Sequence, residues 1–405
     1  MRVLVVNCGS STLKFQLIDT AKGDAAPTAE RDLARGILER IGGSEATLDF
    51  QAGSNVYRDT ATIADHAEAI RRMFAWLDTR GFLAPGGLDA VGHRVVHGGP
   101  HFGAPTRLDD DVITALTQLR ELAPLHNEPA LAAIQATRAV LGTRVPMVAV
   151  FDTAFHHTMP AWAAQYAIPR RLATKYHLRR YGFHGLAHRS MSEGYVALTA
   201  TPMDQLKLVT LQLGSGCSAA AIDAGRSVDT SMGFTPLEGL MMGTRCGDLD
   251  PALPGFLARK EGVETAEVET WLNTRSGLLG VSEHSSDMRA LLAAAGQGEA
   301  GAGLAVAMFC YRVRKYIAAY LAVLNGADAI VFGGGIGENA PEIRARICAR
   351  MDWCGLRLDT ARNTAARGTS ARISTDDATL HAYVMPVDEA RIIAQDTARC
   401  LQAAG

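Results

Sequence analysis

The chain has 405 residues, of which 48% are apolar and 20% are charged, so it can bury a substantial core and does not resemble a disordered protein. One core does not ordinarily serve a chain of this length, and we expect two or three domains. Forty Lys and Arg residues against 42 Asp and Glu residues leave a net charge of −2, which excludes a general attraction to nucleic acid or to an anionic membrane.

The seven cysteines are odd in number and form no C-x-x-C pair, so the sequence indicates neither a disulfide framework nor a zinc knuckle. This cysteine usage fits a reducing cytoplasm. No basic and then apolar leader precedes Asn7, and no uninterrupted apolar run approaches the ~20 residues of a membrane helix. We therefore expect a cytoplasmic protein that is neither exported nor inserted in a membrane.

The first informative segment is Val3 to Phe15, in which an apolar strand breaks into a hydroxyl-rich turn and a second strand follows. Gly9 allows the backbone to approach a ligand closely, residues 10–12 offer hydroxyl donors, and Lys14 adds a positive charge in the same turn. This pattern is typical of a phosphate-binding turn on a β-hairpin. Taken alone, it is equally consistent with an ordinary tight hairpin that carries a surface lysine.

Helix and strand patterns of an α/β protein fill the remainder of residues 1–150. Apolar side chains recur at three- and four-residue spacing over residues 66–77, which predicts a helix. The segment from Val145 to Phe151 predicts a buried strand that runs directly into Asp152. The end of such a strand is the usual position of a functional carboxylate in an open α/β sheet.

Arg94 lies in a segment that allows two interpretations. His93, His97 and His101 have the spacing of a helical metal site, but the glycines and the proline among residues 92–100 exclude a continuous helix, so we do not predict zinc. Arg94 adjoins β-branched residues and a double-glycine turn, which suits a cation that grips a carboxylate in a forked geometry. A structural ion pair would explain this arginine equally well.

The second half of the chain repeats the plan of the first hairpin from Leu208 to Asp223, with Gly214 at the position of Gly9. Two similar halves predict a cleft between two lobes, and the duplication favours phosphate binding at these turns. His184 precedes the repeat, flanked by glycines and preceded by two arginines. A structural loop histidine is the simpler interpretation of that residue.

Arg245 is a second arginine in a glycine-rich setting, which is expected of a cation that follows the charge on a transferring phosphoryl group. Asp248 and Asp250 follow it, and their position before Pro251 indicates an Asx turn rather than a metal site.

The segment from Ala329 to Arg344 predicts a strand, a glycine loop and a helix with a proline near its first turn, whose amino end can receive a nucleotide. Neither glycine loop has the ending of a Walker A motif. Residues 388–401 have the apolar stripe of a closing helix, which we expect to return to the first domain. Its Glu389 is either an ordinary partner of the helix dipole or, together with Asp152, a ligand of Mg²⁺ through water.

Six segments, in order, resemble the acetate kinase family, within the superfamily of acetate and sugar kinases, heat-shock chaperone ATPases and actin. They are Asn7–Lys14, His93–Gly99, Phe151–His156, Tyr181–Gly185, Gly243–Asp248 and Gly335–Asn339, and the resemblance runs from Asn7 to Glu389. It implies an α/β fold of the duplicated, two-domain, ribonuclease H-like (actin and sugar kinase) type with an interdomain cleft. An N-terminal lobe would comprise residues 1–150 and the closing helix in 388–405, and a nucleotide-binding lobe would comprise residues 151–387.

The resemblance also implies the site residues. The catalytic residues would be Asp152, Arg94, His184 and Arg245, of which Arg94 binds the acyl carboxylate. A small apolar pocket for the acetate methyl would be formed by Val96, Leu125, Phe183 and Pro236. Asn7 and Glu389 would place Mg²⁺, with Mn²⁺ as an alternative. ATP or ADP would be bound by Lys14, Gln212, Leu213, Gly214, Ser215, Gly216, Asp287, Met288, Arg289, Gly335, Ile336, Gly337, Glu338 and Asn339.

The implied activity is the ATP- and Mg²⁺-dependent, reversible phosphorylation of acetate to acetyl phosphate by direct in-line transfer. The family resemblance further implies a homodimer, with no nucleic-acid or membrane partner. Acetate is already ionised at neutral pH, so the reaction needs cations that offset the repulsion of two anions rather than a general base. The same chemistry on propionate or butyrate, a sugar kinase, and a nucleotide-dependent chaperone are the alternatives.

The chain departs from the family at a few positions. The family commonly has Ser at Thr12, His at Gln212, Asn-Gly-Ala at residues 215–217 and Asn at Asp388. Hydroxyl and amide donors survive these changes, so we expect phosphate binding to survive as well. Asp388 adds a negative charge beside Glu389.

Overall fold

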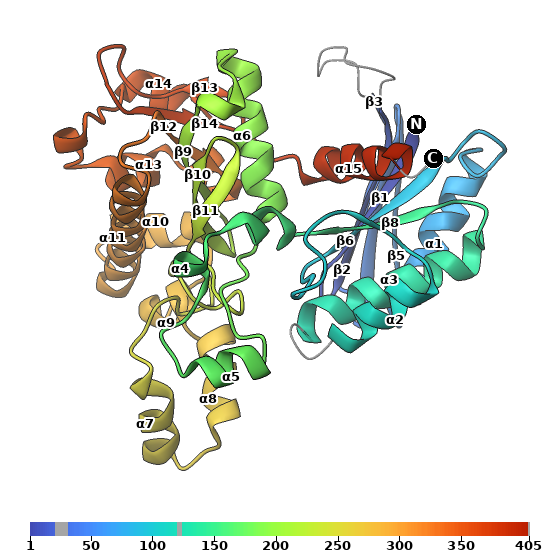
Figure 1. Cartoon of the computed structure of the whole chain (residues 1–405), viewed down its shortest axis with the longest axis horizontal. Coiled ribbons are helices and arrows are strands. Elements are labelled where there is room, and N and C mark those ends of the chain that lie inside the picture. Colours follow the sequence, from blue (N-terminus) through green and yellow to red (C-terminus); the bar gives the residue numbers. More distant parts are fainter. Residues whose placement is uncertain (21–30, 120–123, 404–405) are drawn as a thin grey trace. The chain divides into compact units, whose positions relative to one another are not determined.

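The computed structural model describes residues 1–20, 31–119 and 124–403. The chain divides into two compact units, of which unit 1 comprises Met1–Phe155 with Asp388–Gly405 and unit 2 comprises His156–Val387. Each unit contains one β-sheet with helices packed against it (Figure 1).

Unit 1 contains an eight-stranded sheet in its described residues, in the order β5-β4-β3-β2-β1-β6-β8-β7. The strands are β1 (Arg2–Cys8), β2 (Thr12–Asp19), β3 (Arg31–Glu39), β4 (Ala46–Ala52), β5 (Asn55–Ala61), β6 (Ala90–Val95), β7 (Thr106–Arg107) and β8 (Met147–Phe151). The helices are α1 (His66–Thr79), α2 (Asp110–Gln118), α3 (Pro124–Leu141) and α15 (Glu389–Ala403).

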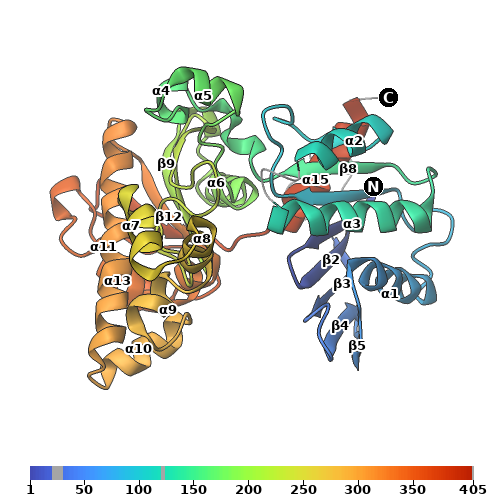
Figure 2. The same cartoon turned by 90° about the horizontal axis from the view of Figure 1, so that it is seen from below.

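The two faces of this sheet follow from the alternation of side chains along its strands. On β1, Leu4, Val6 and Cys8 belong to the core that includes residues of α1 and α3, and these two helices lie side by side (Figure 2). The opposite face is covered by α15, which packs against β1, β6 and β8. A Cβ on Gly92 of β6 would lie 2.3 Å from Thr397 Oγ1 of α15, so the helix approaches this face closely.

Unit 2 contains a six-stranded sheet in its described residues, in the order β11-β10-β9-β12-β14-β13. The strands are β9 (Lys207–Leu213), β10 (Cys217–Asp223), β11 (Arg226–Thr230), β12 (Ala329–Gly333), β13 (Ala371–Arg372) and β14 (His381–Val384). The helices are α4 (Ala161–Ala164), α5 (Arg170–Lys175), α6 (Gly185–Thr199), α7 (Ala252–Glu261), α8 (Thr265–Thr274), α9 (Gly277–Ser282), α10 (Met288–Gly296), α11 (Ala300–Val323), α12 (Gly334–Asn339), α13 (Pro341–Cys348) and α14 (Thr360–Ala365). Short 3₁₀ helices occupy Ala154–Thr158, Met203–Gln205 and Asp352–Cys354.

The two sheets share one strand plan, which confirms the duplication predicted from the sequence. The orders β3-β2-β1-β6-β8 and β11-β10-β9-β12-β14 correspond, with the first three strands antiparallel and the following strands parallel. Each first hairpin closes through a short turn at a glycine. Gly9 N donates to Thr12 O at 2.8 Å, and Gly214 N donates to Gly216 O at 3.1 Å.

One predicted loop is a helix. The glycine-rich run after β12 was expected to be irregular, but residues 334–339 form α12. Arg344 of α13 is buried and its Nη1 donates to the carbonyls of Gly337 and Glu338, at 2.8 and 3.0 Å. These tertiary bonds satisfy carbonyls that a short glycine-rich helix leaves without partners, and therefore override its low intrinsic propensity.

The predicted helix over residues 66–77 and the buried strand before Asp152 are both present, as α1 and β8. All seven cysteines are free thiols. Among the residues that the structure describes, no helix is both long enough and apolar enough to cross a membrane.

Candidate functional site

The polar cluster of unit 1 lies where three parallel strands end. β1, β6 and β8 run parallel side by side, so their carboxyl ends meet at one edge of the sheet. Arg94 near the end of β6 donates through Nε to Asp152 Oδ1 at 3.0 Å and through Nη2 to Asp152 Oδ2, directly after β8. Its Nη1 donates to Asn7 Oδ1 on β1 at 3.1 Å, and Glu389 Oε2 at the start of α15 lies 3.9 Å from Nε.

This cluster is largely removed from water. The side chain of Asp152 is 1% exposed, that of Arg94 17% and that of Glu389 23%. Burial alone would lower the pKa of Arg94, but the charges of Asp152 and Glu389 and the hydrogen bond to Asp152 raise it above its ordinary value. Burial raises the pKa of Glu389, and the positive charge of Arg94 opposes that rise. The arginine therefore stays charged beside both carboxylates.

The forked geometry predicted for Arg94 is present, with the carboxylate of Asp152 as its partner. A guanidinium carries five N–H groups, and three of them take part in the bonds to Asp152 and Asn7. One N–H on each terminal nitrogen remains for another acceptor. Of the two interpretations of this residue, the structure confirms the structural ion pair, and the binding of a further carboxylate by the two remaining donors stays a prediction.

Two other predicted residues of unit 1 lie near this edge, and one is not described. Lys14 was expected in the turn, but it lies in β2. Its side chain is exposed there, and its backbone is the register partner of Asn7 on β1. Val96 is buried directly after β6. Leu125 lies in the first turn of α3, and its side chain is outside the part of the chain that the structure describes.

In unit 2, two predicted catalytic residues meet at the turn of the second hairpin. A Cβ on Gly216 would lie 3.1 Å from Arg245 Nη2 and 3.3 Å from His184 Cε1. Arg245 Nη1 donates to Pro236 O at 2.7 Å, and burial lowers the pKa of Arg245. His184 has a left-handed backbone conformation (φ 57°) at the amino end of α6, which turns its ring away from the helix path. The turn, the arginine and the histidine thus form one polar group.

A chain of hydrogen bonds continues from His184 into the interior. His184 Nδ1 lies 2.9 Å from Ser218 Oγ, which lies 2.8 Å from His188 Nε2, and His188 Nδ1 lies 2.8 Å from Thr210 Oγ1. Burial lowers the pKa of His188 well below its ordinary value, so this histidine is neutral and has a single N–H. The chain therefore fixes the ring orientation of His184.

The nucleotide-binding residues predicted in three separate segments line one cavity of unit 2, with a volume of about 680 Å³. Those that it brings together are Gly214, Ser215, Asp287, Met288, Arg289, Gly335, Ile336 and Asn339. A cavity of this size fits a nucleotide. Ser286, Leu292, Ala340 and Arg367 also line it and were not predicted.

The other predicted nucleotide-binding residues of unit 2 do not line this cavity. Leu213 and Gly337 are buried in the sheet and in α12, and Gly216 lies in the hairpin turn beside Arg245 and His184. Glu338 accepts backbone N–H bonds from Gly334 and Val387 at 3.0 and 3.1 Å, which ties α12 to the end of β14. Gln212 stands where the family commonly has histidine, and its Oε1 is buried without a hydrogen-bond partner.

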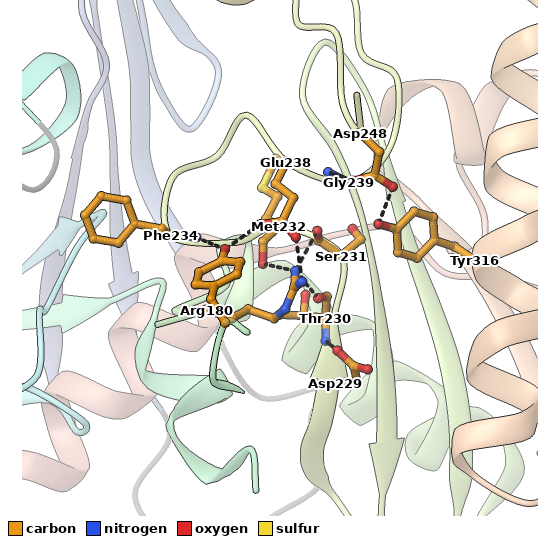
Figure 3. A network of polar contacts seen from close by, with 11 residues as sticks. Arg180, Asp229, Thr230, Ser231, Met232, Phe234, Glu238, Gly239, Asp248 and Tyr316 are labelled. Carbon is orange, nitrogen blue, oxygen red and sulfur yellow. Dashed lines mark hydrogen bonds and ion pairs between the residues drawn. The ribbon is translucent and has the colours of Figure 1, made fainter. Parts of the chain in front are cut away.

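The two aspartates after Arg245 have structural partners. Asp250 Oδ1 accepts from Ala252 N at 2.8 Å, as the predicted Asx turn requires. Asp248 Oδ1 accepts from Gly239 N at 2.9 Å, and its Oδ2 accepts from Tyr316 of α11 at 2.7 Å (Figure 3). Within the described ranges, no group of three or more His, Cys, Asp and Glu side chains could hold a metal ion.

Known proteins resemble this chain along its whole length. The acetokinase family matches residues 2–395. The chain belongs to the acetokinase family. It is 46% identical to the acetate kinase of Solibacter usitatus over 407 residues, which cover 99% of this chain and 98% of that protein.

Solved structures of similar proteins agree with this family assignment. The acetate kinase of Porphyromonas gingivalis has a TM-score of 0.90 at 37% identity and 99% coverage of each chain. A propionate kinase of Francisella tularensis has a TM-score of 0.90 at 35% identity, over 98% of this chain and 99% of its own. As a member of the acetokinase family, this protein is a kinase that uses ATP or ADP, and its mixed α/β fold is of the actin and sugar kinase type.

Some polar residues around Arg245 were not among the predicted site residues. Arg180 and Tyr166 bond to Glu238, which lies in the same segment as Arg245, and Arg367 Nη1 donates to Asn339 O at 2.9 Å beside the cavity. These residues lie in irregular segments with no recognisable motif, and the local sequence gave no signal for them.

Proposed function

We propose that this protein transfers the γ-phosphoryl group of ATP to acetate, giving acetyl phosphate and ADP in a reversible, in-line reaction. The observation that carries the proposal is the meeting of Arg245 and His184 at the turn of the second hairpin, since the same turn lines the nucleotide-sized cavity. Cationic and N–H donors beside a triphosphate are what phosphoryl transfer requires.

The chemistry needs charge neutralisation rather than proton abstraction. Acetate is ionised at neutral pH, so it can attack phosphorus without a base, but it must approach another anion. Lys14, Arg94 and Arg245 offset this repulsion, and each well-placed donor contributes about 3 kcal/mol to the stability of the transition state. His184, held in orientation through Ser218, donates to an oxygen of the transferring group.

Arg94 binds the carboxylate of acetate in this proposal. One N–H on each of its terminal nitrogens is not used by Asp152 or Asn7, and two such donors match the two oxygens of a carboxylate. Asp152 holds the guanidinium in orientation from beneath the site. By the family resemblance, Val96, Leu125, Phe183 and Pro236 would receive the methyl group.

The donors at the sheet edge of unit 1 fit a magnesium ion. The amide oxygen of Asn7 and the carboxylates of Asp152 and Glu389 are the hard oxygen donors that Mg²⁺ prefers, and Mg²⁺ takes only one or two carboxylates when phosphates and waters complete its shell. Asn7 and Glu389 would hold the ion, and Mn²⁺ could replace it. When bound, the ion neutralises negative charge on the phosphate oxygens.

The family resemblance also supports proposals for the two lobes, the oligomeric state and the location of the protein. Unit 1, which extends to Phe155 and so includes Asp152, is the lobe for the acceptor and the metal, and the boundary expected at residue 150 lies within it. Unit 2 is the lobe for the nucleotide, to which Gln212, Leu213, Gly337 and Glu338 would contribute although they do not line the cavity. We propose a homodimer, testable by light scattering of the eluted protein. A cytoplasmic location is supported by the seven free thiols.

The test is the detection of acyl phosphate as its hydroxamate, with acetate, propionate, butyrate and glycerol offered separately as acceptors and ATP as donor. Acetate should give the highest kcat/KM, and propionate should be used less well, because one methylene changes binding by only ~1–3 kcal/mol. Arg245→Ala should abolish the signal without loss of the folded state. Phosphorylation of glycerol in preference to all three acids would contradict the proposal and favour a sugar kinase.

A further inference from the structure

The segment that carries Arg245 and Pro236 has no regular structure of its own. Residues 231–251, between β11 and α7, contain neither helix nor strand. Its shape therefore depends on bonds from elsewhere in unit 2 rather than on a backbone ladder. The side chains that supply these bonds decide where Pro236 and Arg245 lie.

The hydroxyl of Tyr166 bridges the two residues that flank Pro236 in the turn. Tyr166, between α4 and α5, accepts a hydrogen bond at its Oη from Phe234 N at 2.7 Å and donates one to Glu238 Oε2. Phe234 precedes Pro236 by two residues, and Glu238 follows it by two. A single oxygen atom, Tyr166 Oη, thus links the two ends of the turn Phe234–Glu238.

Glu238 is itself held from the other side. Its Oε1 accepts from Arg180 Nη2 at 2.6 Å, and Arg180 Nη1 donates to the carbonyls of Thr230, Ser231 and Met232 at 3.0 to 3.2 Å (Figure 3). The side chains of Arg180 and Glu238 are only 18% and 32% exposed. This ion pair therefore anchors the turn to the end of β11.

The local sequence is adapted to this arrangement. A Cβ on Gly233 would lie 1.7 Å from Glu238 Oε2 and 2.2 Å from Tyr166 Oη, so only glycine allows both groups to approach. Burial and the neighbouring Glu238 raise the pKa of Tyr166 above its ordinary value, and the hydroxyl keeps its proton at neutral pH. Tyr166 is therefore a donor to Glu238 under all working conditions.

We propose that Tyr166 is a specificity-determining residue, whose hydroxyl fixes the position of Pro236 and thereby the length of the carboxylic acid that the enzyme accepts. This inference rests on the proposed function, in which Pro236 is part of the wall of the acyl pocket. An apolar pocket discriminates a methylene by contact alone, so a wall that is free to recede loses discrimination. Tyr166 itself acts as a positioning residue and touches no reacting atom.

The test is Tyr166→Phe, which removes one oxygen and keeps the ring. The phenylalanine leaves Phe234 N and Glu238 without their bridge, and the turn gains freedom around Pro236. The ratio of kcat/KM for propionate to that for acetate should rise about five-fold, within the range that one methylene controls. The KM for ATP should stay unchanged, because the nucleotide cavity is lined by other segments.

Two control variants separate this role from a general loss of structure. Tyr57→Phe removes a hydroxyl that bonds to Asp59 on β5 of unit 1, and should leave the ratio unchanged. Tyr316→Phe removes the bond to Asp248 at the other end of the same segment, and should lower kcat for both acids alike. Glu238→Ala removes the acceptor of the bridge and should reproduce the effect of Tyr166→Phe, which covers the case that Tyr166→Phe does not fold.

The outcomes are distinct. A wild-type protein that phosphorylates none of the acids overturns the proposed function and, with it, this inference. An active wild type, together with a propionate-to-acetate ratio that stays within about two-fold in both Tyr166→Phe and Glu238→Ala, overturns the role of Tyr166 alone. A rise of the ratio in both variants, and not in Tyr57→Phe or Tyr316→Phe, supports it.

Discussion

At the scale of single residues, Arg94 pairs with Asp152 in the folded protein, and we propose that it also binds the carboxylate of the substrate. Arg94→Ala should raise the KM for acetate by at least about ten-fold more than the KM for ATP, because the carboxylate loses a charged donor pair. It should also lower the free energy of unfolding by roughly 3–5 kcal/mol, since Asp152 would be left buried without its partner. Steady-state kinetics and urea unfolding measure the two effects.

Arg94→Lys is the matched control for this prediction. It keeps a positive charge beside Asp152 but cannot form the fork, so it should retain more of the stability and still lose acetate binding. Equal increases in the KM values of acetate and ATP in Arg94→Ala would contradict the role of this residue.

Ser218 provides a second test at this scale. Ser218→Ala breaks the link through Ser218 between His184 and the buried His188, so kcat should fall about ten-fold while the KM for ATP is unchanged. Ser227→Ala is a fair comparison, because Ser227 is also buried and is bonded to a different histidine, His156. Equal losses of kcat in the two variants would rule out a specific role for Ser218.

The cysteines near the glycine turns should be inert. Cys8 and Cys217 are buried, which raises the pKa of each thiol to about 12, and burial raises the pKa of Cys246 to about 11. The reactive thiolate is therefore scarce near neutral pH. Treatment with iodoacetamide at pH 7.5 should leave activity unchanged with or without ATP, and an inactivation that ATP prevents would disprove this.

At the scale of elements, α12 depends on the conformation of a single glycine. Gly334 has φ +74°, and a Cβ on it would lie 2.6 Å from Leu213 O and 2.9 Å from Gln212 Nε2, whereas Gly335 has no atom within 4 Å of a Cβ. Gly334→Ala should therefore displace α12, raise the KM for ATP several-fold and lower stability by at least ~1 kcal/mol.

Gly335→Ala is the control on the same helix. It should leave the free energy of unfolding close to that of the wild type, because alanine favours a helix and no atom obstructs the methyl group. Thermal unfolding and ATP kinetics of both variants check the pair. If Gly334→Ala and Gly335→Ala unfolded with equal free energies, position 334 would tolerate a side chain, and the prediction would be wrong.

Helix α12 also marks the limit of what could be predicted from the sequence alone. Local patterns identified the two hairpins, α1, the buried strand before Asp152 and the Asx turn at Asp250, because each depends on neighbours in sequence. They did not identify α12, which Arg344 stabilises from the next helix. They also missed Tyr166, which meets Glu238 across 72 residues and has no motif around it.

The candidate site divides in the same way. A fork on Arg94 and a tight turn at Gly214 could be predicted from residue type and glycine spacing, whereas phosphate binding at that turn stays a prediction. That Asp152 occupies the fork depends on the parallel register of β6 and β8, in which Arg94 pairs with Val150, and no local pattern carries that register. The gathering of three nucleotide segments around one cavity is likewise a property of the folded sheet.

At the scale of the whole molecule, both units use the same strand order, and this order does not determine which side chains lie at the ends of the strands. In unit 1, the carboxyl ends of β1, β6 and β8 carry Asn7, Arg94 and Asp152. These polar side chains suit the binding of a carboxylate and a metal ion. The equivalent strands of unit 2 end in glycine turns and in α12, which line a cavity. The duplicated sheets thus carry different residues at equivalent edges, polar side chains in unit 1 and glycine-rich segments in unit 2.

The last prediction concerns the acid stability of the whole protein, which buried histidines should limit. Burial lowers the pKa of His93 to about 3 and those of His97 and His156 to about 4. In the unfolded chain each binds a proton below pH ~6.5, so the unfolded state gains protons first as the pH falls. Stability is therefore full above pH ~6.5 and declines as the pH falls toward 4, by roughly 2 kcal/mol per histidine at pH 5.

Glu389 and Asp229 act in the opposite sense, since burial raises the pKa of each and so favours the folded state at low pH, but the buried histidines, His188 included, outnumber them. Urea unfolding at pH 7 and pH 5 should therefore show a loss of several kcal/mol, with little change between pH 7 and pH 8. His93→Gln does not titrate, and it should reduce the difference between pH 7 and pH 5 by about one histidine's share, ~2 kcal/mol. An equal free energy of unfolding at pH 5 and pH 7 in the wild type would mean that these histidines are protonated in the folded protein, although His93, His97 and His156 are all buried.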